Sequence, residues 1–198
     1  MKEKHKLFID KKIREIAKTK DVLDIGGGEP FQKWLSEYRD LFVGCEYRTM
    51  DYDPKSGAEV IGDIHDIPLP DNSTGSIICH CVLEHVKDPI RAVAELHRIL
   101  KPGGIVFGRV PSIYPYHARK GHYPDYWRLF DDTLFFLFKD FKSIELQKRG
   151  GYFKALFFFL PRQNKLRFFI DPVANFLDTL FKTEKRTTTS DYYFFAIK

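Results

Sequence analysis

The chain has 198 residues, of which 43% are apolar, and this is the size of one domain with enough apolar side chains for a sizeable core. Its formal net charge of +5 does not by itself indicate nucleic-acid binding, because the basic residues are spread over both ends and the middle of the chain. Cys45, Cys79 and Cys81 are an odd number, and the only close pair is a C-x-C whose side chains would point to opposite faces of a strand. The cysteines therefore argue against a zinc site and for a reducing compartment.

The N-terminal segment is charged and lacks the apolar core of a signal peptide. The sequence contains no uninterrupted apolar stretch of about 18 residues, the length that indicates a transmembrane helix. We therefore expect a cytoplasmic protein.

Strands and helices alternate over the first half of the chain. Ile9, Ile13 and Ile16 share one face of a charged segment, which predicts an amphipathic helix over 9–18. The pattern then predicts strands over 22–25, 46–50, 59–61, 76–83 and 105–110, with helices over 31–42 and 88–100. Lys-Pro-Gly-Gly at 101–104 ends the second of these helices, because proline cannot continue a helix and glycine tolerates a left-handed turn. Alternation at this spacing predicts a parallel sheet with helices on both faces.

The remainder of the chain departs from this rhythm. The predicted elements are a loop over 111–130, a helix over 131–139, a strand over 142–149, a Phe-rich segment over 152–182 and a final strand over 191–197. We expect a single domain over 1–198, with the Phe-rich segment inserted before the last strand.

The segment VLDIGGGEP predicts a strand that runs directly into three glycines, Gly26 to Gly28. A turn without Cβ atoms lets the backbone come into contact with a ligand. Asp51 ends the following strand, where a carboxylate can accept hydrogen bonds from the two hydroxyls of a ribose. The pair predicts a nucleoside-bearing ligand at the carboxyl ends of the strands, and the alternative is a buried turn without a ligand.

Two residues indicate whether the ligand is S-adenosylmethionine (SAM) or a dinucleotide. A dinucleotide site has a third glycine in G-x-G-x-x-G, where this chain has Phe31. Asp24, inside the strand before the glycines, is unfavourable beside a pyrophosphate but suits a turn that faces a cationic amino-acid ligand. The turn therefore favours SAM.

Five motifs resemble, in order and spacing, those of the class I SAM-dependent methyltransferases, specifically the type 11 group. They are VLDIGGGEP, TMDYDP, GDIHDIPLPDNS, CHCVLEHVKDP and RILKPGGIVFGRVP. The resemblance implies a Rossmann-like three-layer α/β sandwich, with a seven-stranded, mostly parallel sheet whose last strand is antiparallel. It also implies SAM as cofactor. The turn departs from the family pattern, because Gly27 is followed by Gly28, Glu29 and Pro30.

The resemblance also implies roles for individual residues in cofactor binding. The residues concerned are Asp24, Gly26, Gly27, Gly28, Asp51, Tyr52, Asp63, Ile64 and His80. Asp24 would orient the methionine moiety over the glycine turn, and Asp51 would accept hydrogen bonds from the ribose. Tyr52 would cover the adenine, whose edge would meet the Asp63 carboxylate and the Ile64 backbone amide.

Three of the polar residues in this region have further interpretations. His80, near the end of the fourth strand, would line the methyl-donor pocket in the family pattern. Asp63 has an alternative role in capping a turn, in which aspartate is common. His85 is more typical of a histidine that holds a loop by hydrogen bonding, and we leave it outside the predicted site.

The segment 114–130 is too rich in His, Tyr, Trp and Arg for a simple connector. Loops after the carboxyl ends of strands form the crevice of an open α/β sheet, so we expect this loop to bind the acceptor. The predicted acceptor-binding residues are His117, His122, Tyr123, Asp125, Tyr126, Trp127 and Arg128. The stretch HYPDYWRLF resembles an element of bacterial and archaeal type 11 methyltransferases that is often associated with glycan or cell-surface biosynthesis.

Methyl transfer to oxygen needs a base in addition to alignment. The candidate bases are His80, His117, His122 and Asp125, and we favour His122. The alternative for Asp125 is an ion pair with Arg128 that shapes the loop. We expect no metal site, because the acidic residues do not group with histidine at ligand spacing.

The chain has 19 phenylalanines, and most of them lie in its second half. Within 152–182 they are interleaved with Lys154, Arg162, Lys165 and Arg167, a pattern that suits an anionic membrane surface. A homodimer face, a lid or completion of the core are the alternatives. A membrane contact would favour a lipid-linked glycan as acceptor.

These observations predict a SAM-dependent methyltransferase that acts on an oxygen or nitrogen atom of a small-molecule or glycan-type acceptor. One alternative is a SAM- or nucleoside-binding protein without catalytic activity. The other is an NAD-dependent oxidoreductase, which would bind NAD and ignore SAM.

Overall fold

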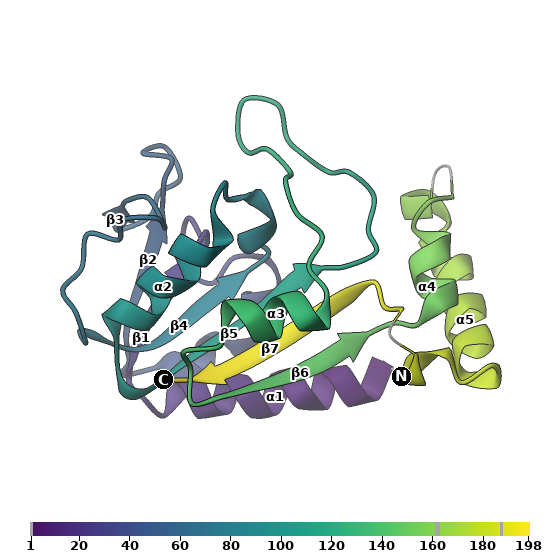
Figure 1. Ribbon diagram of the computed structural model, residues 1–198, viewed down its shortest axis with the longest axis horizontal. Coiled ribbons are helices and arrows are strands. Elements are labelled where there is room, and N and C mark those ends of the chain that lie inside the picture. Colours follow the sequence, from purple (N-terminus) through teal and green to yellow (C-terminus); the bar gives the residue numbers. More distant parts are fainter. Residues whose placement is uncertain (1, 161–162, 187) are drawn as a thin grey trace.

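The computed structural model describes residues 2–160, 163–186 and 188–198 (Figure 1). Its helices are α1 (Lys2–Ala17), η1 (Lys33–Phe42), η2 (Leu83–His85), α2 (Pro89–Ile99), α3 (Asp131–Leu137), α4 (Tyr152–Phe157), α5 (Gln163–Leu180) and η3 (Thr183–Lys185), where η denotes a 3₁₀ helix. Its strands are β1 (Asp21–Ile25), β2 (Glu46–Asp51), β3 (Val60–Ile61), β4 (Thr74–His80), β5 (Leu100–Pro111), β6 (Ser143–Arg149) and β7 (Asp191–Ile197). Arg162 of the predicted basic pattern lies outside the described residues, as do the side chains of Lys165 and Arg167.

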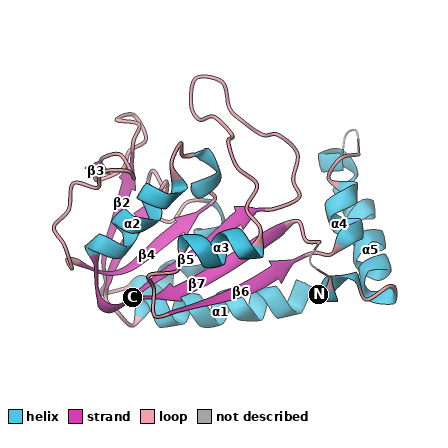
Figure 2. Cartoon of the chain, in the orientation of Figure 1, coloured by secondary structure: helices cyan, strands magenta, loops and turns pink. Residues whose placement is uncertain are grey.

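The seven strands form one sheet in the order β3-β2-β1-β4-β5-β7-β6 (Figure 2). Strands β1 to β5 pair in parallel, and β7 runs antiparallel to both of its neighbours, β5 and β6. The predicted fold, a seven-stranded and mostly parallel sheet with an antiparallel last strand, is therefore confirmed. The order reverses between β1 and β4, and this is where open α/β sheets form a crevice for ligands.

Helices cover both faces of the sheet, as the alternating pattern predicted. Leu96 of α2 and Leu134 of α3 are fully buried in one apolar cluster with side chains of the sheet. Ile13 and Ile16 of α1 are fully buried in the other, together with Leu35 of η1. The three-isoleucine pattern of the first helix thus faces the core.

Several elements differ from the sequence prediction. Helix α1 begins at Lys2 and not at residue 9, and strand β4 ends at His80 and not at residue 83. The helix after the glycine turn is a 3₁₀ helix, in which residues three apart share a face, and Leu35 and Tyr38 are buried at that spacing. Strand β5 begins at Leu100, not at 105, because Leu100 already pairs with Thr74. The Pro-Gly-Gly segment is taken into the strand as an irregularity, in which Gly103 has a φ of 75° and donates its N–H to the backbone oxygen of Lys198.

The Phe-rich segment forms the helices α4 and α5, which lie together beyond the carboxyl end of β6 (Figure 1). Asp178 of α5 is fully buried and accepts hydrogen bonds from the backbone N–H groups of Gly151, Phe153 and Lys154, at the start of α4. The hydroxyl of Thr183 donates to the same carboxylate. One side chain therefore holds the first turn of α4 against α5.

Many aromatic side chains of the Phe-rich segment are exposed, including Phe159, Phe168, Phe169, Phe176 and Phe181. They do not complete the core, which was one alternative from the sequence. Among the described residues, no helix is both long enough and apolar enough to span a membrane.

Lys154 corrects the predicted basic pattern. Its side chain is buried and forms an ion pair with Asp171 of α5, so it is not part of a basic surface. Helix spacing alone could not reveal this partner, because Asp171 belongs to the other helix of the pair.

Candidate active site

A cleft of about 970 Å³ lies at the carboxyl ends of the parallel strands. Its walls come from the segments that follow β1, β2 and β4 and from the loop between β5 and α3. Residues in and before the glycine turn form one part of the wall. Histidines of the segment after β4 and of the loop between β5 and α3 form another part. The cleft therefore brings the two predicted halves of the site into one space.

The glycine turn is shaped so that a Cβ atom would not fit. Gly26 has a φ of 73°, and a Cβ on it would lie 2.6 Å from a methyl carbon of Val82. A Cβ on Gly27 would lie 2.4 Å from the Asp24 carboxylate. Asp24 therefore packs directly beneath the turn and at the same time lines the cleft. Gly28 has a φ of 61° and does not line the cleft.

Asp24 is 4% exposed and accepts a hydrogen bond of 2.8 Å from the hydroxyl of Tyr47. Burial raises the pKa of the Asp24 carboxyl to about 7, although the hydrogen bond from Tyr47 opposes this rise. A buried carboxyl that titrates near neutral pH on the wall of a cleft is typical of a binding or catalytic site.

Asp51 ends β2 and lines the cleft with one carboxylate oxygen available. Its Oδ1 accepts the backbone N–H of Asp53 at 3.0 Å, and Oδ2 makes no hydrogen bond to the described residues. Tyr52 follows it on the cleft wall and is 58% exposed. These positions suit contact with a ribose and a base.

Asp63 and Ile64 line the cleft beyond Asp51. Oδ1 of Asp63 accepts the backbone N–H of His65 at 2.9 Å and contacts the His65 ring at 2.6 Å. The hydrogen bond from the His65 backbone is the largest of the effects that lower the pKa of Asp63, which is therefore an acceptor at neutral pH. Asp63 thus caps a turn, as the alternative interpretation held, while lining the predicted cofactor end.

The loop between β5 and α3 is fastened to the short helix η2. The backbone N–H groups of Tyr126 and Trp127 donate to the backbone oxygen of Glu84, at 2.8 and 3.1 Å. The indole N–H of Trp127 donates to the backbone oxygen of Val86 at 2.8 Å. These bonds bring the loop, which is distant from η2 in sequence, to the carboxyl end of β4.

Asp125 and Arg128 form an ion pair that shapes this loop. The guanidinium donates two hydrogen bonds of 2.7 Å to the two carboxylate oxygens, and it also donates to the backbone oxygens of Tyr114 and Pro115. Burial would raise the pKa of Asp125, but the hydrogen bonds from Arg128 and from the His117 backbone outweigh it and lower the pKa to about 2. This geometry favours the loop-shaping role over that of a base.

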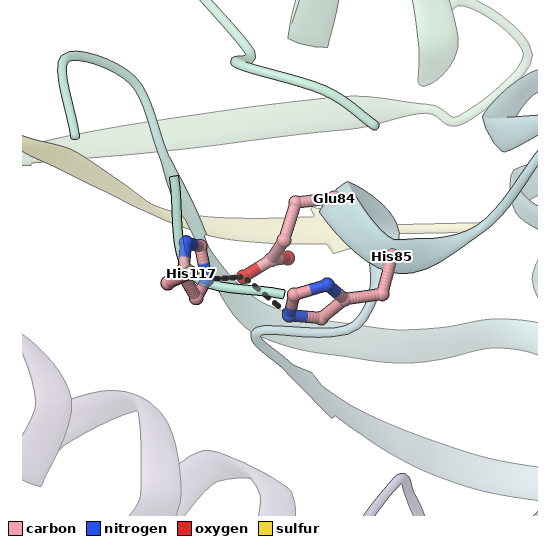
Figure 3. A group of neighbouring side chains, drawn as sticks. All are labelled: Glu84, His85 and His117. Atoms are coloured by element: carbon pink, nitrogen blue, oxygen red, sulfur yellow. Dashed lines mark ion pairs between the residues drawn. The ribbon is translucent and has the colours of Figure 1, made fainter. Parts of the chain in front are cut away.

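Glu84, His85 and His117 point toward one another at the wall of the cleft (Figure 3). One oxygen of Glu84, Oε1, lies 3.8 Å from Nε2 of His85 and 4.0 Å from Nε2 of His117. Glu84 is fully buried, and neither of its carboxylate oxygens has a hydrogen-bond partner in another of the described residues. Burial raises the pKa of Glu84 to about 8. The sequence did not predict this grouping, and His85 was placed outside the predicted site.

Arg109 and Asp191 form a buried ion pair on another part of the cleft wall. Asp191 is 1% exposed, and its Oδ1 accepts a hydrogen bond of 2.9 Å from Nε of Arg109. Burial disfavours the charge of Arg109, but the Asp191 carboxylate more than offsets this and raises the pKa of Arg109. The pair links the carboxyl-terminal part of β5 to the first residue of β7 beneath the cleft.

Residues 23–108 match the family model of the methyltransferase domain. An uncharacterized methyltransferase of Schizosaccharomyces pombe is 46% identical over 113 residues, which are 48% of this chain and 41% of that protein. A probable S-adenosylmethionine-dependent methyltransferase of Mycolicibacterium smegmatis is 29% identical over 124 residues, which are 51% of this chain and 46% of that protein. The chain spans less than half the length of these two relatives.

The fold also matches solved structures over nearly its whole length. A SAM-dependent methyltransferase from Archaeoglobus fulgidus superimposes with a TM-score of 0.64 at 17% identity, over 100% of this chain and 95% of that one. Phosphoethanolamine N-methyltransferase 2 of Haemonchus contortus, in complex with SAM, has a TM-score of 0.57 at 17% identity, over 89% of this chain and 48% of that one. The match over residues 23–108 and these relatives support a class I SAM-dependent methyltransferase domain, and the solved structures show that the chain has its fold.

SAM is the cofactor of this methyltransferase family, and the residues at one end of the cleft fit it. A Cβ at Gly26 or Gly27 would collide with Val82 or Asp24, so only glycine lets the backbone of the turn keep its place on the cleft wall. Beneath it, Asp24 offers a carboxylate that suits the cationic methionine moiety, and the available oxygen of Asp51 suits a ribose hydroxyl. These four residues would hold the cofactor.

The cleft gathers most of the residues that the sequence predicted. The predicted residues that line it are Asp24, Gly26, Gly27, Asp51, Tyr52, Asp63, Ile64, His80, His117, His122, Tyr123 and Tyr126. His80 stacks on Trp34 with ring centroids 4.6 Å apart. Asp125, Trp127 and Arg128 do not line the cleft, and their hydrogen bonds act on the shape of the loop.

Sequence reasoning missed Glu84, Arg109 and Asp191 as residues of the site. Glu84 follows the end of β4, and a charged residue just after a buried strand is a signal that was available. Arg109 interrupts an apolar strand near its carboxyl end, which was a second signal. Asp191 begins the antiparallel strand, so the rule for carboxyl ends did not point to it.

Proposed function

We propose that the chain transfers the methyl group of SAM to an oxygen or nitrogen atom of a small-molecule or glycan-type acceptor. The observation that carries this proposal is the single cleft in which the glycine turn and Asp51 share a wall with histidines of the acceptor loop. Tyr114, Tyr123 and Tyr126 add aromatic and hydroxyl surface to the same cleft, which suits a polar ring such as a sugar.

When bound, SAM supplies an electrophilic methyl group on a sulfonium. Asp24 and Asp51 would fix the two ends of the cofactor, and the aromatic loop residues would align the acceptor and exclude water. His122 is exposed at the cleft and would take the proton of an acceptor hydroxyl as that oxygen attacks. His80, stacked on Trp34, would line the methyl-donor pocket without taking the proton.

The test measures binding and turnover separately. Isothermal titration with SAM and with NAD distinguishes the methyltransferase from an oxidoreductase, and we expect binding of SAM alone. S-adenosylhomocysteine is then measured after incubation of the protein and SAM with a deproteinised cell extract. The Gly27→Val variant, whose side chain would collide with the Asp24 carboxylate, is the negative control. SAM binding without turnover in extracts from several sources would favour the binding protein without catalytic activity.

Asp24 makes SAM binding pH-dependent if it faces the cationic methionine moiety. Its pKa of about 7 means that it is protonated below this pH and ionised above it. A cation prefers the ionised form, so we expect SAM affinity to rise by up to about tenfold per pH unit below pH 7 and to level off above it. Isothermal titration between about pH 5.5 and 8 measures this rise and the proton released on binding.

The Asp24→Asn variant is the direct check on that pH dependence, because it keeps the shape of the side chain and removes the titration. Asp21→Asn is the control, since Asp21 lies on the same strand at its other end and pairs with Lys101. We expect Asp21→Asn to keep the rise and Asp24→Asn to lose it. The same slope in both variants would assign the titration to another group.

We also propose that α4 and α5 contact an anionic membrane surface. Phe168, Phe169 and Phe176 are 83%, 70% and 65% exposed, which is unusual for large apolar side chains. Lys182 and Lys185 are exposed just beyond the end of α5 and would meet anionic lipid headgroups. A lipid-linked glycan is then the favoured acceptor.

Co-sedimentation with vesicles that contain phosphatidylserine tests this contact. We expect Phe168→Ser with Phe169→Ser to weaken binding by roughly tenfold or more, because two apolar anchors are lost. Phe135→Ser with Phe136→Ser, an adjacent exposed pair on α3, is the matched control and should bind as the wild type does. Analytical ultracentrifugation of the same variants reports the rival: a wild-type dimer that dissociates in the α5 variant would assign the surface to homodimer formation.

A further inference from the structure

Three ligand atoms that could bind one metal ion come from Glu84, His85 and His117. One oxygen of Glu84 and one ring nitrogen from each histidine lie within 4.8 Å of one another. Two ligand atoms on one tetrahedral zinc ion are about 3.4 Å apart, from bond lengths of about 2.0 to 2.2 Å. The distances of 3.8 and 4.0 Å from Glu84 Oε1 to the two nitrogens therefore need only a small closure of the side chains.

Hydrogen bonds on the far side of each ring direct the lone pairs toward Glu84. Nδ1 of His85 is in hydrogen-bond contact with the backbone oxygen of Pro124, which can only accept. The proton is thus on Nδ1, and Nε2 of His85 carries the lone pair. Metal-binding histidines in general donate their other N–H to a carbonyl or carboxylate in this way.

His117 has the same arrangement. Its Nδ1 lies 3.2 Å from the backbone oxygen of Pro115 and 3.2 Å from Oδ2 of Asp125, which both accept, and farther away, at 3.5 Å, from the donor Nη2 of Arg128. The two nearer acceptors favour a proton on Nδ1. Nε2 is therefore the free nitrogen, and it is the atom that faces Glu84. The Asp125–Arg128 ion pair, which shapes the loop, thus also orients a ring of the cluster.

Glu84 itself supplies the strongest sign of a missing partner. Its side chain is 1% exposed, and both oxygens are buried without a hydrogen bond from any other residue that the structure describes. A buried carboxylate of this kind is costly unless a cation or a donor meets it. The two nearest ring nitrogens present lone pairs and donate no hydrogen bond to Glu84, whereas a cation between the three groups would contact all of them and favour the ionised carboxylate.

We propose that Glu84, His85 and His117 bind one first-row divalent transition-metal ion, of which zinc is the representative. Two imidazoles and one carboxylate suit such an ion, whereas magnesium and calcium prefer oxygen ligands throughout. Three protein ligands leave a coordination position, and the cluster lines the cleft. An oxygen of the acceptor can occupy that position; this role rests on the proposed methyl transfer, but metal binding itself does not.

The test uses the purified full chain, stripped with a chelator and then dialysed with zinc or cobalt(II). Metal analysis counts the zinc retained, and the visible ligand-field bands of cobalt report nitrogen and oxygen coordination. We expect one equivalent per chain in the wild type, and more than tenfold weaker binding in Glu84→Gln and in His117→Ala. His122→Ala is the matched control, because His122 belongs to the same loop and lies outside the cluster; it should bind zinc as the wild type does.

Titration with SAM runs in parallel on every variant. Glu84→Gln keeps the volume of the buried side chain, so retained SAM binding shows that this variant is folded. A wild-type chain that binds SAM but neither zinc nor cobalt would overturn the metal site, and so would equal zinc binding in Glu84→Gln. A chain that binds zinc through this cluster but ignores SAM would uphold the metal site and overturn the proposed function.

Discussion

Replacing Asp51 with alanine is expected to weaken SAM binding by about 1 to 3 kcal/mol, roughly 5- to 150-fold. Asp51 ends β2 on the cleft wall, and its Oδ2 makes no hydrogen bond to the described residues. In the proposed complex the carboxylate accepts hydrogen bonds from the ribose, and bonds to a charged group are stronger than those between neutral groups. Isothermal titration of wild type and variant at one pH measures the loss.

Two further variants separate this effect from a disturbed turn. Asp51→Asn keeps an acceptor oxygen for the N–H of Asp53, so it should retain the turn and lose only part of the affinity. Glu46→Ala removes an exposed carboxylate at the other end of the same strand and should leave SAM binding unchanged. An Asp51→Ala variant with wild-type affinity would contradict the assignment to the ribose.

Replacing Arg109 with methionine is expected to lower the free energy of unfolding by about 3 to 5 kcal/mol. The change leaves the buried charge of Asp191 without its main partner. Arg149, whose Nη1 lies 3.5 Å from Oδ2 of Asp191, offsets part of the cost, so we expect the lower end of this range. Urea denaturation at neutral pH, followed by circular dichroism, measures the change.

Lys101→Met is the matched control on the same strand. Lys101 pairs with Asp21 at 2.6 Å, but its side chain is 50% exposed, and exposed ion pairs contribute less than about 1 kcal/mol. A loss for Arg109→Met no larger than that for Lys101→Met would show that the buried pair does not hold β5 and β7 together.

The sheet was predictable because its strands carry local signals. The apolar run before Gly26 defined β1, and the strand ending at Asp51 followed it with nearly the predicted bounds. The side-chain period could not distinguish an α-helix from the 3₁₀ helix at Lys33–Phe42, since both bury residues three apart. The start of β5 was missed because proline and glycines hid a strand pairing that begins at Leu100.

The cofactor end of the cleft was more predictable than the acceptor end. Asp24 lies in β1 and Asp51 ends β2, so the pairing of these two neighbouring strands places both residues at the cleft. Glu84 and His117 belong to different segments, and their approach depends on hydrogen bonds such as that from Trp127 to Val86. Tertiary contacts of this kind have no period or spacing in the sequence.

The chain leaves the sheet for the helix pair α4–α5 and returns to the sheet at the same place. Arg149 at the end of β6 and Asp191 at the start of β7 are partners in the same antiparallel ladder, so the whole excursion is topologically a long hairpin loop. The conformational entropy of closing such a loop grows only slowly with its length. Hydrogen bonds to Asp178 hold the two helices of this loop together. The loop can therefore be lengthened, shortened or exchanged during evolution at little cost to the stability of the seven-stranded sheet.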